Sequence, residues 1–249
     1  MAHTDELHAV LKRLRLSGLL ETMDLRIGQL VDDNLDAQEF LYRLFNDEAE
    51  RRNGRQLQRR IRAAGFESLK TIADFDFGFN PELPKQEIIE VATGAFITKN
   101  ENVLIVGPAG VGKSHIAQAI GVRACQAGKK VLYVSARSLF TTLRAGRGDG
   151  TYEKRLAAYA KADLIIIDDL GLHPLNQDEP ADLYEIIRRR YERGATIITS
   201  NRDIPEWFSL FGDSLLASAA MDRLLHHCHT LTLEGRSYRT TSRPSTAQT

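Results

Sequence analysis

The segment from Gly107 to Ser114, GPAGVGKS, has the residue types and spacing of a phosphate-binding loop. It follows the apolar run NVLIVG and precedes the helical stretch HIAQAIGVRACQAG, which is the context that the GxxxxGK[ST] pattern requires. Glycines let backbone N–H groups turn toward an anion, and a helix N-terminus adds its dipole. We therefore predict an ATP site. Its residues are Gly107, Pro108, Ala109, Gly110, Val111, Gly112, Lys113, Ser114 and His115.

Two acidic residues supply the predicted second half of this site. Asp168 and Asp169 directly follow the apolar run LIII. We expect Lys113 to reach the β- and γ-phosphates, and Asp168 to hold Mg²⁺ together with the hydroxyl of Ser114. Asp169 would orient or deprotonate the attacking water. Many ATPases of this type have the longer glutamate there, so two alternatives stay open for this chain: slow ATP turnover, or ATP binding without turnover. A third alternative is that the two aspartates are simply exposed residues of a loop.

A third apolar run, ATIITSN, ends at Asn201. An amide at that place can position water beside the γ-phosphate. The alternative is a helix cap or an Asx-turn before the segment RDIPEW.

The apolar runs from about residue 85 onward show no alternation, and helical stretches separate them. This pattern favours a parallel sheet buried on both faces, so we predict a three-layer α/β P-loop domain. We expect helices at 112–127, 136–143, 152–162 and 179–193, with a last strand in HTLTLEG.

The remaining chain divides by composition. Residues 1–68 read as a small helical module, with breaks expected at Gly18 and Asn34. Residues 69–84, rich in phenylalanine and proline, read as an ordered linker. The ATPase domain then covers 85–235, and the polar segment 236–249 reads as a fraying tail.

The order of these motifs, ending in MDRLLHHCHTLTLEGRSYR, resembles the IstB-like transposition helper ATPases of bacterial insertion sequences. These belong to the AAA+ superfamily and are related to DnaC-type helicase loaders. The resemblance covers nearly the whole chain, including the linker ADFDFGFNPEL. It implies a homo-oligomer with ATP at subunit interfaces that assembles on target double-stranded DNA and stimulates a cognate transposase. Hydrolysis would then control disassembly.

The same resemblance implies roles for two arginines. Arg223 in MDRL would be an arginine finger that reaches the γ-phosphate held by a neighbouring subunit. The alternative is a surface arginine paired with Asp222. Arg239 in SYR would be a second sensor arginine.

An arginine-rich stretch, ERRNGRQLQRRIRAAG, is the strongest local basic feature of a chain whose Lys+Arg and Asp+Glu both total 33. One helical face would present Arg51, Arg55, Arg59 and Arg62, which could contact DNA phosphates without sequence-specific readout. The alternative is a solvated face paired with nearby carboxylates, namely Asp47, Glu48 and Glu50.

Other features narrow the choice of function. The segment HHCH at 226–229 is not expected to bind metal, because consecutive residues converge poorly on one ion. The two cysteines, Cys125 and Cys228, form no CxxC pair, and no apolar run reaches membrane-spanning length, so we expect a cytoplasmic protein without membrane contact. A helicase loader would share the nucleotide motifs. A small-molecule kinase would need a second pocket or lid, for which there is no signature.

Overall fold

The computed structural model describes residues 2–33, 35–176 and 178–238. It divides into two compact units, Met1–Arg59 and Arg60–Thr249. The sequence placed this division at residue 68. The difference arises because the chain from residue 60 already packs on the second unit: the ring of Phe66 lies 6.1 Å from that of Tyr133, and Ser68 N–H donates to Gln118.

The first unit is helical, as its apolar spacing predicts. Its small core joins Leu11, Leu19, Met23 and Leu44. The first helix break lies at 14–16, ahead of Gly18 rather than at it, and Asn34 lies outside the described residues. The helices are α1 (Ala2–Arg13), α2 (Ser17–Asp32) and α3 (Ala37–Ala64), the last of which continues beyond this unit.

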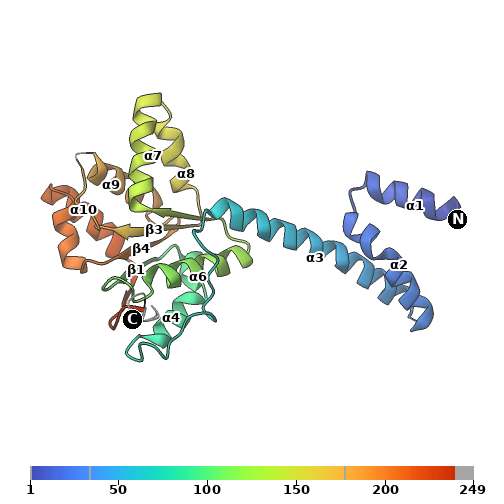
Figure 1. Ribbon diagram of the computed structural model, residues 1–249. Coiled ribbons are helices and arrows are strands. Elements are labelled where there is room, and N and C mark those ends of the chain that lie inside the picture. The colour runs from blue at the N-terminus through green and yellow to red at the C-terminus, as the bar shows by residue number, and fades with distance from the viewer. Residues whose placement is uncertain (1, 34, 177, 239–249) are drawn as a thin grey trace, which may run out of the picture. The chain divides into compact units, whose positions relative to one another are not determined.

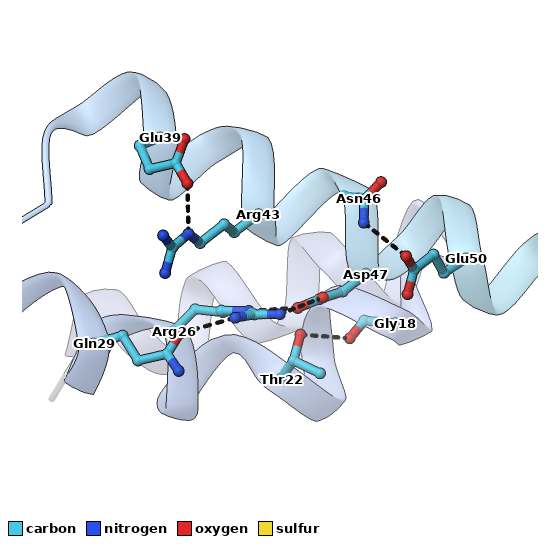
Figure 2. A network of polar contacts seen from close by, with 9 residues as sticks. All are labelled: Gly18, Thr22, Arg26, Gln29, Glu39, Arg43, Asn46, Asp47 and Glu50. Atoms are coloured by element: carbon cyan, nitrogen blue, oxygen red, sulfur yellow. Dashed lines mark hydrogen bonds and ion pairs between the residues drawn. The ribbon is translucent and has the colours of Figure 1, made fainter. Parts of the chain in front are cut away.

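Gly18 serves the packing of α2 against α3 instead. A Cβ there would lie 2.8 Å from the Cα of Glu48. The buried carboxylate of Glu48 accepts the N–H of Gly18 at the start of α2, where the helix dipole favours a negative charge. Nearby, Arg26 donates to both carboxylate oxygens of Asp47 at 2.7 and 2.8 Å (Figure 2). Polar contacts therefore align these two helices beside a minimal core.

The second unit contains a five-stranded sheet in the order β2-β3-β4-β1-β5, in which every pairing is parallel. Residues in β1, β3 and β4 are almost all buried, as expected for apolar strands covered on both faces. The strands are β1 (Asn102–Val106), β2 (Val131–Ser135), β3 (Leu164–Leu170), β4 (Ala195–Ser200) and β5 (Cys228–Thr232).

Helices cover both faces of this sheet, which confirms the predicted three-layer α/β architecture (Figure 1). One layer contains α6 (Lys113–Gln126) with α4 (Lys85–Ala92) packed against it. The other layer contains α7 (Ala136–Asp149), α8 (Tyr152–Ala160), α9 (Glu179–Arg190), η1 (Ile204–Leu210) and α10 (Ser214–Leu225). A short helix, α5 (Ala95–Lys99), precedes β1. No helix within the described ranges is long and apolar enough to cross a membrane.

The helix α9 ends at Arg190, three residues before the predicted end at 193, and this last residue is buried. Arg190 is 1% exposed, and its guanidinium donates to the carbonyls of Tyr159 in the last turn of α8, of Ala162 just past that helix, and of Ala195 at the start of β4. Burial lowers the pKa of Arg190 to about 10. This arginine therefore joins two elements of the core, whereas Arg188 and Arg189 form surface ion pairs with Glu185.

Candidate nucleotide-binding site

The loop between β1 and α6 has the backbone of an anion-binding nest. Gly107, Gly110 and Gly112 have φ angles of 144°, 86° and 106°, which only glycine adopts readily. A Cβ at Gly107 would also collide with the carbonyl oxygen of Leu233. The helix α6 begins directly after these glycines at Lys113, so its dipole and its first N–H groups are available to a phosphate.

Lys113 places a positive charge inside this loop. The side chain is 6% exposed, and its Nζ donates to the carbonyls of Gly107 at 2.8 Å and Pro108 at 2.9 Å. A buried ammonium held by the glycine loop fits a polyphosphate, because both the charge and the nest attract anions. The residues present therefore suit the predicted ATP.

Asp168 lies at the end of β3 and is 4% exposed. It accepts a hydrogen bond from the Tyr133 hydroxyl at 2.5 Å and another from the hydroxyl of Thr199. Burial, and then the carboxylate of Asp168, raise the pKa of Tyr133 well above its usual value. The carboxylate thus stands at the strand tip, as predicted, and its hydroxyl partners come from the strands on either side of it.

Asp169 differs from its neighbour in both backbone and exposure. It has a φ of 58° and an exposed side chain, and its N–H donates to Thr199 Oγ1 at 2.9 Å. The register between β3 and β4 shifts at this point, between Ile167 and Leu170. Such a bulge turns one side chain away from the sheet, so Asp168 is held inward while Asp169 reaches solvent.

One cavity of about 680 Å³ collects most of the predicted site residues. The P-loop from Ala109 to His115, together with Asp168, Asp169 and Asn201, lines it. The order of the strands explains this, because the carboxyl ends of β1, β4 and β3 are neighbours in the sheet, and such edges of open α/β sheets bind ligands.

The linker also lines this cavity, which the sequence reasoning missed. Phe75 packs closely against Gly112: a Cβ at position 112 would lie 2.5 Å from the Phe75 ring. The centres of the Phe75 and His115 rings are 5.2 Å apart. His115 in turn contacts the carbonyl of Thr71 at 3.0 Å. The closely spaced phenylalanines of 69–84 were the available signal, because aromatic residues in a linker usually need a surface to cover them.

The first residues of the predicted tail are packed rather than frayed. Asn80 joins the linker to Arg236 through two hydrogen bonds of 3.0 Å each, one in each direction. Tyr238 N–H donates to the Gly110 carbonyl at 3.0 Å, and its ring lies 4.9 Å from that of Phe79. The segment 236–238 therefore contacts both the P-loop and the linker. Arg239, the predicted second sensor, lies outside the described residues.

Arg223 does not line the cavity of its own chain. On α10, its guanidinium donates to the carbonyl of Ala219 at 2.8 Å and lies 5.7 Å from the ring centre of Tyr184. In the described part of the chain it forms no ion pair with Asp222. Its role as a finger stays a prediction.

The four arginines predicted to share one face of α3, here called the arginine stripe, differ in exposure and contacts; they are Arg51, Arg55, Arg59 and Arg62. Arg51 is half-buried, forms an ion pair with Glu21 and donates to the Ser17 carbonyl at 2.9 Å. Arg55 donates to the Ser17 hydroxyl at 3.2 Å, although its side chain is exposed. Arg59 and Arg62 are exposed as well. Arg51 thus contributes to the pairing of α2 with α3, and DNA contact by the stripe stays a prediction.

The HHCH segment has neighbours that its sequence does not reveal. Glu192, from the loop before β4, lies with His226 and His227 so that their potential ligand atoms are within 4.8 Å of one another. All three side chains are exposed. His229 Nε2 instead lies within hydrogen-bonding distance of the Glu101 carboxylate, at 2.9 Å. The residues are adjacent, but nothing beyond their proximity indicates an ion.

Comparison with known proteins agrees with this geometry. A glycine nest, a buried lysine and a strand-end aspartate on a parallel sheet define a P-loop nucleotide-binding domain. The chain belongs to the family of IstB-like ATP-binding proteins, whose family profile matches residues 9–246.

Two relatives have names that place them in insertion sequences and describe them as ATP-binding. The relative from insertion sequence IS21 of Pseudomonas aeruginosa is 36% identical over 94% of this chain and 88% of its own length. The relative from insertion sequence IS5376 of Geobacillus stearothermophilus is 36% identical over 94% of each chain.

Solved structures share the fold. The DnaC helicase loader superimposes with a TM-score of 0.52 at 21% identity, covering 60% of this chain and 87% of the loader. The replication initiator DnaA bound to AMPPCP and single-stranded DNA gives a TM-score of 0.57 at 21% identity, covering 69% of this chain and 52% of DnaA. These values show that the chain shares its fold with both proteins.

Proposed function

We propose that this protein is a Mg²⁺-dependent ATPase that assembles on double-stranded DNA and stimulates the transposase of its insertion sequence. The observation that carries the proposal is the single cavity where the P-loop meets Asp168, Asp169 and Asn201. Its family and its insertion-sequence relatives supply the biological setting. A cytoplasmic location fits a protein that acts on chromosomal DNA.

Within the cavity each residue has a separate task. The P-loop N–H groups and Lys113 bind the phosphate chain. Ser114 and Asp168 would hold Mg²⁺, which supplies charge neutralisation at the phosphates. Asp169, exposed and directed away from the sheet, accepts the proton of the attacking water. Asn201 positions that water from the end of β4.

A complete site would need a second copy of the chain. Arg223 lies outside the cavity of its own protomer, so it serves hydrolysis only if it reaches the cavity of a neighbour. A guanidinium there would stabilise the charge that develops on the phosphate oxygens. We therefore propose a homo-oligomer with ATP at its interfaces, and Arg239 as a second contact to the nucleotide.

The arginine stripe of α3 is the proposed DNA contact. The chain has no net charge, so local clustering must supply the attraction to phosphates. The exposed Arg59 and Arg62 are best suited to it, with Arg51 and Arg55 contributing beside their contacts to α2. Contacts to phosphates alone would give binding without strong sequence preference.

The test is phosphate release measured with ATP alone, with DNA, and with DNA plus the transposase encoded by the same element. We expect Mg²⁺-dependent turnover and DNA-bound oligomers that form with ATP, and Lys113→Ala should lose both. Capture of a replicative helicase instead of the transposase would favour a helicase loader. Phosphate transfer to an added small molecule would favour a kinase, and binding without turnover a scaffold.

A further inference from the structure

The bulge at the end of β3 sets two acidic residues against a single threonine. Ile167 pairs with Ile198 and Leu170 with Ser200, so Asp168 and Asp169 together oppose Thr199. Thr199 is fully buried. Its hydroxyl donates to Asp168 Oδ1 and accepts the N–H of Asp169 at 2.9 Å. One hydroxyl group therefore fixes the side chain of the first acid and the backbone of the second.

A second hydroxyl reaches Asp168 from the opposite strand. Ser135 of β2 pairs with Asp168, and Tyr133 lies two residues earlier on the same side of the sheet. The Tyr133 side chain, 5% exposed, donates to Asp168 Oδ2 at 2.5 Å. The hydrogen bond of the Tyr133 hydroxyl goes to Asp168, and Tyr133 does not line the nucleotide cavity.

We infer that Tyr133 and Thr199 are positioning residues with different effects on the two acids, Asp168 and Asp169. Tyr133 sets the affinity for the divalent cation through its hydrogen bond to Asp168, whereas Thr199 sets both cation affinity and turnover because it also bonds the N–H of Asp169. The inference rests on the proposed ATPase function. A carboxylate has about four lone-pair sites, so two hydroxyl donors on different oxygens leave each oxygen able to face a cation.

The two residues should therefore have different kinetic signatures. Partners that orient a ligating carboxylate typically change metal affinity about 10–100-fold when removed. Tyr133→Phe should raise the Mg²⁺ concentration for half-maximal activity about tenfold or more, with a kcat near wild type at saturating Mg²⁺. Thr199→Val should raise it similarly and also lower the saturated kcat about tenfold or more, since Asp169 is then displaced from the attacking water.

The experiment measures the Mg²⁺ dependence of hydrolysis on the full-length protein and adds two readouts of cation binding. One readout is the affinity for a fluorescent ATP analogue with Mg²⁺ and in EDTA, and the other is Mn²⁺ binding followed by electron paramagnetic resonance, neither of which needs turnover. ATP affinity in EDTA should not change in either variant. Tyr159→Phe is the matched control, because it removes a hydroxyl from another largely buried tyrosine of the same unit. Thr199→Ser, which keeps the hydroxyl, should recover both properties.

The outcomes separate this inference from the function on which it rests. If wild-type protein shows no Mg²⁺-dependent nucleotide affinity or no hydrolysis, the proposed ATPase function fails first, and the turnover role of Thr199 fails with it. If wild type behaves as expected but Tyr133→Phe has the cation dependence of Tyr159→Phe, the role of Tyr133 is refuted. A saturated kcat lowered equally by both variants would refute the division between them.

Discussion

The arginine stripe gives a prediction whose size follows from the structure. Arg59 and Arg62 are exposed, whereas Arg51 pairs with Glu21. Each arginine that contacts a DNA phosphate releases condensed counterions, which contributes about 0.9 to the slope of log affinity against log salt. Changing both Arg59 and Arg62 to alanine should therefore flatten the slope by about 1.8 if each makes one contact.

That slope translates into a measurable change of affinity. Between 50 and 200 mM salt, a difference of about 1.8 in slope changes the ratio of wild-type to mutant affinity about 12-fold. The assay is fluorescence anisotropy with two unrelated duplexes in the presence of ATP. Both duplexes should show the same flattening, because phosphate contacts carry no sequence information, and the affinity for ATP should stay at the wild-type value.

The control must remove the same charge from a different environment. Arg43→Ala does so on the same helix, at an arginine paired with Glu39 at 2.6 Å, and it should leave the slope unchanged. A folded Arg59→Ala, Arg62→Ala double variant with the wild-type slope would refute the reasoning. The DNA path would then have to lie on another surface.

Three further predictions concern catalysis and stability. Asp169→Asn should bind MgATP normally but hydrolyse it at least about tenfold more slowly and stay longer on DNA, since Asp168 keeps the cation; normal phosphate release would assign the base elsewhere. Arg223→Ala should bind ATP yet lose turnover, and mixing it with Lys113→Ala should restore some phosphate release by completing one kind of interface. Asp182→Asn should lower the free energy of unfolding, measured in urea, by about 3 kcal/mol. The reason is that this carboxylate, 1% exposed, accepts hydrogen bonds from both Arg147 and Tyr152. A decrease of less than about 1 kcal/mol would contradict the prediction.

The estimate for Asp182 is the lower end of the range for breaking a buried ion pair. Its partner Arg147 has a side chain that is 35% exposed, so water can solvate the guanidinium once the carboxylate is lost. Nucleotide affinity should not change, because neither residue lines the cavity.

Local patterns were sufficient to predict the sheet and the backbone of the P-loop. The strands are continuous apolar runs, so their existence followed from composition alone, and the P-loop glycines have positive φ angles that the motif requires. The parallel arrangement then fixed where Asp168 and Asn201 would lie, since the ends of neighbouring parallel strands share one edge. These predictions depended only on contacts near in sequence or on general topology.

The features that escaped prediction depend on contacts between distant segments. Asn80 bonds to Arg236, and Tyr133 to Asp168, across separations that no local period encodes. Arg190 lies among charged residues at a helix end, yet its guanidinium is buried by carbonyls from two other segments, the end of α8 and the start of β4. The sequence around each of these polar residues does not tell whether the side chain is exposed to solvent or is buried with its hydrogen bonds made. Only the folded structure distinguishes these two states.

The bulge at Asp168 and Asp169 shows what such a contact adds to function. Two adjacent aspartates after an apolar run predicted a pair of acids with different roles, but an ideal strand would only alternate them across the sheet. The register shift opposite Thr199 instead keeps one carboxylate buried between two hydroxyls and turns the other toward the cavity. In our proposal, the separation of cation binding by Asp168 from water activation by Asp169 depends on Thr199 and Tyr133, two residues that belong to no motif.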